Sequence, residues 1–304
     1  MRPLLLLPVA ASLAALALMT PGAGAPASAL AVTATGPTPS SWESGHAVPV
    51  APRWWPYGRS HASAAWRTTW PQPVAFSPSA RGELSGLTIA LDPGHDIGNS
   101  LHLSAIDATY WVGLTKACNT TGTATNAGYA ESTFNFDVAA RVRRLLAAHG
   151  ATVVLTRDRN STSTYGPCIG ARGALAKQEG ALLTVSLHGD GAPSWGHGFH
   201  VIAPAYYAGY TDDIYWRSKS LATQMIAGLK SVGLTPTNYL SSPLSIRKDQ
   251  GTLNTSDVPI VTVESLNMRN SSDAHLASTS AGRQKIADGV YAGILRYVRY
   301  LRSL

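Results

Sequence analysis

Residues 87–96 read L-T-I-A-L-D-P-G-H-D, an apolar run that ends in a turn followed by a histidine. The run Leu87–Leu91 is typical of a buried strand, and Pro93 and Gly94 are residues that end a strand in a turn. In a parallel α/β sheet, ligands bind just beyond the carboxyl ends of the strands. We therefore expect His95 to lie at a binding edge, although a lone histidine in such a place is more often structural.

Strands and helices alternate along the chain after this stretch. The segment from Glu131 to Gly150 repeats apolar residues at helical spacing, and a long loop, residues 93–130, precedes it. The predicted strands are residues 87–91, 151–156, 181–187, 199–203 and 259–263, and the predicted helices are residues 131–150, 170–179, 212–232 and 281–301. The pattern predicts a single α/β domain with a mostly parallel, twisted sheet of about six strands and helices on both faces.

The first residues carry the pattern of a signal peptide. A basic start at Arg2 precedes a long apolar run, and the small residues at 27–29 suit cleavage. We expect residues 1–29 to be removed, and an uncleaved anchor is the alternative because the run is long for a signal peptide. The mature protein is then secreted to the periplasm or cell wall. No later segment is apolar enough to span a membrane.

Residues 30–85 are rich in Pro, Ser, Ala and Trp and have neither strand nor helix periodicity. We interpret them as a linker or irregular arm before a folded domain of residues 86–304. The arm holds five of the eight tryptophans, so part of it is expected to pack on the domain, and glycan binding by exposed tryptophans is the alternative. The five are Trp42, Trp54, Trp55, Trp66 and Trp70.

The formal net charge is +7 over 304 residues, which favours an anionic partner. Nucleic acid is excluded as a partner because the chain has no recognisable nucleic-acid module and is expected to be exported. An anionic wall polymer fits better, and a charge that serves only solubility is the alternative. The two cysteines, Cys118 and Cys168, are predicted to form a disulfide, since an isolated pair in an exported protein is more often a bridge than a metal or redox site.

Four ionisable residues are predicted at one edge of the sheet. His95, His188 and Glu264 each follow a predicted strand, and Glu131 begins a helix. Two imidazoles and a carboxylate suit a zinc site with an open position, and a second carboxylate could act as a general base. Each residue also has a structural interpretation. Glu131, for example, could simply stabilise a helix N-terminus.

Motifs in a fixed order give a family resemblance. D-P-G-H at residues 92–95 is followed by a helix that opens with Glu131 and by a strand that ends in Thr156-Arg157. S-x-H at residues 186–188 and an apolar strand ending in Glu264 complete the set. Each motif is short, but the ordered set is specific. From residue 87 to residue 301 the chain resembles the zinc-dependent N-acetylmuramoyl-L-alanine amidases of the amidase_3 type.

The resemblance implies roles for these residues. His95, Glu131 and His188 would bind Zn²⁺, and Glu264 would be the catalytic base and acid. The implied reaction is hydrolysis of the amide bond between N-acetylmuramic acid and L-alanine in peptidoglycan. Arg247 is a candidate for binding a carboxylate of the stem peptide, and a charged surface residue is its alternative interpretation.

Two residues depart from the family pattern. Asp190 stands where many relatives have asparagine, and Asp96 stands where glycine is frequent, so hydrogen bonding around the zinc is expected to differ. Arg172 matches a family arginine with a structural role.

Two other functions remain open at this point. The first is a zinc carboxypeptidase or endopeptidase that cuts within the stem peptide, and the second is a wall-binding or activator domain with a degenerate site. We expect the protein to be a monomer, with peptidoglycan or a muropeptide as its substrate.

Overall fold

The computed structural model describes residues 73–304. The predicted leader, residues 1–29, and the five tryptophans of the arm lie outside the described residues. Among the described residues, no helix is both long and apolar enough to cross a membrane.

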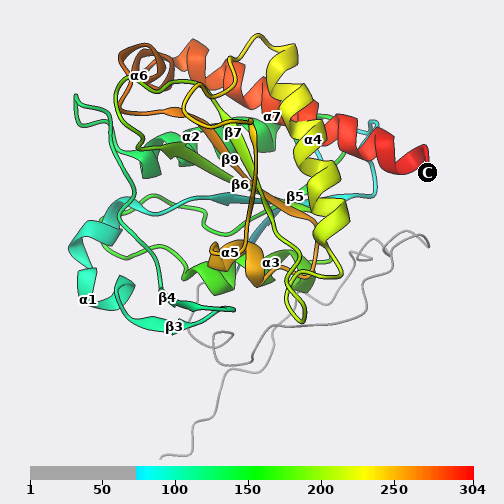
Figure 1. Ribbon diagram of the computed structural model, residues 1–304. Helices are drawn as coiled ribbons and strands as arrows, with labels where there is room; N and C mark the ends of the chain where they lie inside the picture. Colours follow the sequence, from blue (N-terminus) through cyan, green and yellow to red (C-terminus); the bar gives the residue numbers. More distant parts are fainter. Residues whose placement is uncertain (1–72) are drawn as a thin grey trace, which may run out of the picture. The chain divides into compact units, whose positions relative to one another are not determined.

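A seven-stranded sheet forms the centre of the domain, in the order β1-β5-β2-β6-β9-β7-β8 (Figure 1). Strands β5, β2, β6 and β9 are parallel neighbours, and β7 and β8 are parallel to each other. β1 is antiparallel to β5, and β7 is antiparallel to β9. The predicted mostly parallel α/β fold is confirmed. In sheet order the strands are β1 (Val74–Phe76), β5 (Thr152–Leu155), β2 (Thr88–Pro93), β6 (Thr184–Asp190), β9 (Ile260–Asn267), β7 (His200–Pro204) and β8 (Leu244–Arg247).

The two edge strands, β1 and β8, were not expected from the sequence. Three and four residues long, they are too short for an alternating pattern to be recognised, and neither is fully buried. β1 lies inside the segment interpreted as the arm, so the sheet begins before Gly86. Its pairing with the buried strand β5 is a contact between distant residues that local sequence does not reveal.

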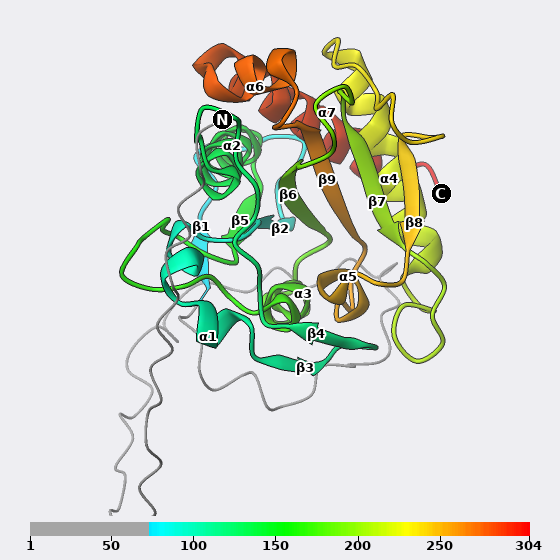
Figure 2. The ribbon, with the colours of Figure 1, turned by 60° about the vertical axis from the view of Figure 1, so that its left-hand side comes forward.

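Helices cover both faces of the sheet, as predicted. On one face lie α2 (Glu131–Ala148), α4 (Tyr215–Ser231) and α7 (Ser280–Arg302), and on the other lie α3 (Ile169–Gln178) and the short α5 (Gly251–Asn254) (Figures 1 and 2). The larger core lies under α2, α4 and α7. Smaller elements are the 3-10 helix η2 (Ile97–Leu101), α1 (Leu103–Ile106), α6 (Ser271–Ser278) and the hairpin of β3 (Thr109–Trp111) and β4 (Thr115–Ala117).

Close packing of α4 on α7 depends on small residues. A Cβ atom on Gly228 would overlap the backbone of Gly293, and one on Gly293 would lie 2.6 Å from the Met225 sulfur. The remaining contact face of α7 is apolar at helical spacing and includes Ile286, Val290 and Ile294, all fully buried. Burial of this face holds the C-terminal helix against the sheet layer that carries the site.

The long loop after β2 is tied to α3 by the predicted disulfide. Cys118, which follows β4, is bonded to Cys168 at the start of α3. The Ile169 amide donates to the Cys118 carbonyl over 2.8 Å, and the Asn119 side chain donates to the Pro167 carbonyl over 2.7 Å. The bridge therefore joins the hairpin segment to the helix beneath the site.

Removing this disulfide is expected to destabilise the fold. The bridge closes a loop of 50 residues, so a Cys118→Ser/Cys168→Ser variant should lose about 4 kcal/mol of unfolding free energy on the chain-entropy model. Urea unfolding of both proteins without reductant measures the difference. Reduced wild-type protein, which should match the variant, is the control. Two free thiols in the intact mass of exported protein would contradict the assignment.

Candidate metal centre and active site

Arg172 holds the turn that carries His95. Its guanidinium is buried beneath β2 and donates to the Asp92 carboxylate over 2.6 Å. The same group donates to the carbonyls of Pro93 and His95, each over 2.8 Å. One buried cation thus binds both ends of the Asp92–His95 turn, which confirms a structural role for this residue.

Arg157 holds the turn from the other side. Its side chain donates to the Pro93 carbonyl over 2.9 Å and to the Gly94 carbonyl over 3.2 Å. A further bond of 2.8 Å reaches the Ser132 carbonyl in the first turn of α2. Because Glu131 precedes Ser132, this arginine connects the turn after β2 to the helix that carries the carboxylate of the site.

Asp92 is buried and charged. Burial alone would raise the pKa of its carboxyl group, but Arg172 and hydrogen bonds from Ser186 and Thr156, each 2.6 Å long, hold that pKa below its ordinary value. The carboxylate therefore links β2 to β6 and to the residue that follows β5, in addition to the backbone pairing of these strands.

His95 has a left-handed backbone, with φ of 57°, and no other non-glycine residue within residues 73–304 has a positive φ. Such a conformation is uncommon for a residue with a Cβ, and where it persists the surroundings hold it in place. The two arginines supply that constraint. The result is a histidine ring directed at His188 and Glu131.

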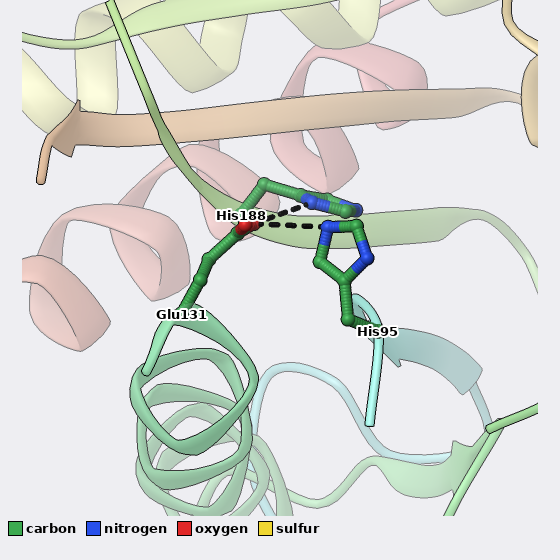
Figure 3. A group of neighbouring side chains, drawn as sticks. All are labelled: His95, Glu131 and His188. Atoms are coloured by element: carbon green, nitrogen blue, oxygen red, sulfur yellow. Dashed lines mark hydrogen bonds and ion pairs between the residues drawn. The ribbon is translucent and has the colours of Figure 1, made fainter. Parts of the chain in front are cut away.

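Three side chains converge as predicted (Figure 3). The Glu131 Oε1 atom lies 3.3 Å from His95 Nε2 and 2.9 Å from His188 Nδ1. One potential ligand atom from each residue lies within 4.8 Å of the others, close enough for the three to bind one ion. His95 donates through Nδ1 to the Thr120 carbonyl over 3.0 Å, which orients the ring and leaves Nε2 facing the cluster.

The cluster is built to hold positive charge. Burial would raise the pKa of Glu131, but the rings of His95 and His188 lower it well below its ordinary value. Glycines make the necessary room, since a Cβ atom on Gly94 would overlap the His188 ring and one on Gly122 would lie 2.7 Å from Glu131 Oε2. Two imidazoles and a carboxylate in one place form a donor set that fits a metal ion.

Glu264 lies beside the cluster. It pairs with His188 across β6 and β9, and because the register is direct the two side chains point to the same face of the sheet. Burial, together with the carboxylates of Glu131 and Asp190, raises its pKa well above the ordinary value. Its Oε2 atom is buried without a hydrogen-bond partner in the described part of the chain. A buried carboxyl group with an unpartnered oxygen and a raised pKa does not stabilise the fold, and such groups are concentrated at functional sites.

A family model described as N-acetylmuramoyl-L-alanine amidase, Amidase_3, matches residues 89–296. The chain belongs to the Amidase_3 family. The N-acetylmuramoyl-L-alanine amidase Rv3717 of Mycobacterium tuberculosis is 34% identical over 230 residues, which are 74% of this chain and 92% of the relative.

Solved structures of related amidases agree with this assignment. The N-acetylmuramyl-L-alanine amidase Ami1 of Mycobacterium smegmatis is 34% identical, with a TM-score of 0.66 over 71% of this chain and 99% of that one. Ami1 of Mycobacterium abscessus is similar to the same degree, with 34% identity and a TM-score of 0.65 over 70% of this chain and 99% of that one.

Arg247, the candidate for binding a carboxylate of the stem peptide, lies on the edge strand β8. It ends β8 and pairs with Asp249 through two hydrogen bonds of 2.8 and 2.7 Å. The residue nevertheless lines a cavity that reaches His95 and His188. Arg247 therefore shares a cavity with two residues of the candidate metal site.

The two aspartates that depart from the family pattern have different neighbours. Asp96 caps η2 by accepting from the Gly98 amide over 3.0 Å, and its other oxygen lies 3.5 Å from Arg157. Asp190 accepts from the Tyr239 hydroxyl over 2.9 Å. Asp96 therefore supports the turn after His95, whereas Asp190 lies on the Glu264 side of the site.

Sequence reasoning missed His200, which is buried at the start of β7 and pairs with Glu264 across β9. Its ring is 5.9 Å from that of Tyr239, and its Nδ1 lies 3.4 Å from the Tyr239 hydroxyl. The predicted strand 199–203 contained His200, but the antiparallel direction of β7, which brings it to the site, left no local signal.

The Asp92–Arg172 pair is expected to be strongly coupled. Asp92→Asn leaves a buried guanidinium without its counter-charge, so it should reduce the unfolding free energy by about 3 to 5 kcal/mol. The Asp92→Asn/Arg172→Met double variant should lose less than the sum of the single losses, as measured by urea unfolding. Glu83→Gln, at the exposed pair with Arg299, is the control and should change stability far less. Additive losses at Asp92 and Arg172 would refute the coupling.

Proposed function

We propose that this protein is a secreted zinc amidase that hydrolyses the amide bond between N-acetylmuramic acid and L-alanine in peptidoglycan and releases the stem peptide. The observation that carries the proposal is the cluster of His95, Glu131 and His188 with Glu264 on the adjacent strand. Family membership supports it, because the matched family and the relatives are named as amidases of this specificity.

His95, Glu131 and His188 are the proposed ligands of one Zn²⁺ ion. The nitrogen and oxygen donors suit zinc, and a site with three protein ligands leaves a coordination position open for chemistry. Bound zinc would supply a Lewis acid that polarises the scissile carbonyl and lowers the pKa of water. The hydrogen bond from His95 Nδ1 to Thr120 fixes which nitrogen of that ring is offered.

Glu264 is the proposed general base and acid. Its carboxylate would accept a proton from the attacking water, and the protonated group would then deliver it to the amine of L-alanine as the C–N bond breaks. Burial and the neighbouring carboxylates Glu131 and Asp190 raise its pKa well above the ordinary value, which suits a group that must both take and give a proton. Arg247, on the cavity wall, would bind a carboxylate of the stem peptide.

The proposed domain organisation is a leader of residues 1–29, a linker and a catalytic domain that begins at β1 rather than at residue 86. Export to the cell wall would bring the enzyme to its substrate. The proposed active form is a monomer, because one chain supplies all four residues of the site.

Replacement of Glu264 tests its role. The Glu264→Gln variant should keep the metal and lose about 10²- to 10⁴-fold in kcat, since general acid–base catalysis contributes on that scale. Zinc content by mass spectrometry of the native protein and release of stem peptide from muropeptides are the two measurements. A variant that retains full activity would show that another group transfers the proton.

Replacement of the ligands tests the metal site. Glu131→Gln and His188→Ala should each weaken zinc binding and abolish activity, and a chelator should inactivate wild-type protein until zinc is restored. The matched control is His149→Ala, because this exposed histidine caps the C-terminal end of α2, at the opposite end of the helix from Glu131. A fully zinc-loaded Glu131→Gln/His188→Ala double variant would refute the ligand assignment.

Product analysis separates the amidase from its alternatives. An amidase leaves free lactyl carboxylates on the glycan and a stem peptide that begins with L-alanine. New termini within an intact stem would instead identify a carboxypeptidase or endopeptidase, and binding without any turnover would identify a wall-binding domain.

A further inference from the structure

An exposed set of aromatic side chains takes no part in the chemistry proposed above. Five occur within residues 206–216, in the loop from β7 to α4 and the first turn of α4, and a sixth ends β3. We call this set the aromatic surface, and it consists of Trp111, Tyr206, Tyr207, Tyr210, Tyr215 and Trp216. Trp111, Tyr206 and Trp216 are 63, 61 and 67% exposed. Contiguous exposed apolar groups of this kind mark interaction sites.

The six side chains form two groups, one of Trp111, Tyr207 and Tyr210 and the other of Tyr206, Tyr215 and Trp216. The ring centroids of Tyr207 and Tyr210 are 4.7 Å apart, and those of Tyr215 and Trp216 are 4.8 Å apart. Tyr206 packs against Tyr215 with its centroid at 6.1 Å. Trp111 joins the first group from the hairpin, where its indole N–H donates to the Tyr210 hydroxyl over 2.6 Å.

The backbone beneath these rings is anchored. The Thr211 hydroxyl donates to the Ala205 carbonyl over 2.6 Å, and Ile214 is fully buried. The Tyr207 hydroxyl donates to the Gly113 carbonyl over 2.7 Å, which fixes the loop to the hairpin. Side chains held in this way lose little conformational entropy when a ligand binds.

Contacts within the protein connect the aromatic surface to the cavity that His95 and His188 line. Gly251 and Thr252 of α5 line that cavity together with His95. Two residues further on, the Asn254 side chain donates to the Val112 carbonyl in the hairpin over 3.1 Å. The hairpin and α5 lie on the same side of the sheet (Figure 2), and Trp111 of the aromatic surface ends β3 of that hairpin.

We infer that the aromatic surface binds the glycan strand of peptidoglycan. Pyranose rings present apolar C–H faces that stack on indole and phenol rings, and their hydroxyl and acetamido groups can bond to tyrosine hydroxyls. The inference rests on the proposed function, because the glycan is the part of that substrate that continues beyond the scissile bond.

The chemistry of the loop favours a glycan over a lipid surface. Ile214, the one aliphatic residue larger than alanine within residues 205–217, is buried, so the loop offers no aliphatic side chain for insertion into a bilayer. Asp212 and Asp213 lie in the same loop, and their negative charges would oppose binding to anionic lipid headgroups.

Removing two exposed rings tests the inference on substrates of two sizes. The Tyr206→Ala/Trp216→Ala variant should lose about tenfold in kcat/KM on intact peptidoglycan sacculi, which corresponds to the stacking of two rings. It should cleave N-acetylmuramoyl-L-alanyl-D-isoglutamine, which has no glycan strand, like wild type. Trp195→Ala is the control, since this tryptophan is 65% exposed in the loop after β6. Equal losses from the control and the double variant would overturn the inference.

Binding without turnover separates this inference from the proposed function. The full-length Glu264→Gln protein should cosediment with sacculi and bind chitohexaose, and adding Tyr206→Ala/Trp216→Ala should weaken both interactions about tenfold. Glycan recognition would be refuted if the added substitutions left binding to sacculi and chitohexaose unchanged. It would also be refuted if the rings were required for binding to phosphatidylglycerol vesicles instead. A wild-type protein that binds sacculi through these rings but releases no stem peptide would instead refute the amidase proposal alone.

Discussion

The ion pair between Asp92 and Arg172 is the interaction on which the candidate site depends. It joins β2 to α3 in the buried interior of the domain, and the same guanidinium binds the carbonyls on either side of the turn. A buried charge pair stabilises a structure only when its remaining hydrogen-bonding groups are satisfied, and here Ser186 and Thr156 satisfy the carboxylate. The pair therefore specifies where the turn lies more than it adds to the stability of the sheet.

The turn after β2 positions the cluster of His95, Glu131 and His188. His95 keeps its left-handed backbone because Arg157 and Arg172 bind the carbonyls around it. Glu131 is placed by the start of α2, which Arg157 also contacts, and His188 is placed by β6. His95 and Glu131, from distant parts of the chain, thus depend on one set of buried arginine contacts, and the pairing of β6 with β2 brings His188 to them.

The cavity extends from this cluster along the face of the sheet covered by α3 and α5. Its walls come from the segments that the disulfide and the hairpin contacts hold together, so access to the metal cluster and the aromatic surface are parts of one arrangement. The chemistry and the proposed recognition of polymer are separated in space. In the proposed function the cluster would act on one amide bond, whereas the aromatic rings would contact the glycan strand beyond it.

The sequence by itself determined the alternation of strands and helices, because apolar runs and helical spacing are local signals. It also determined the pairing of Cys118 with Cys168, since the two cysteines are an isolated pair. The four residues at the binding edge were found because each is an ionisable residue at the end of a predicted strand or the start of a predicted helix. Only the tertiary structure decided that β7 runs antiparallel, that His200 therefore meets Glu264, and that Arg247 reaches the cavity from an edge strand. These features depend on which distant segments pair and in what register. Local periodicity is the same for a strand of either direction, so that choice is made by packing across the whole domain.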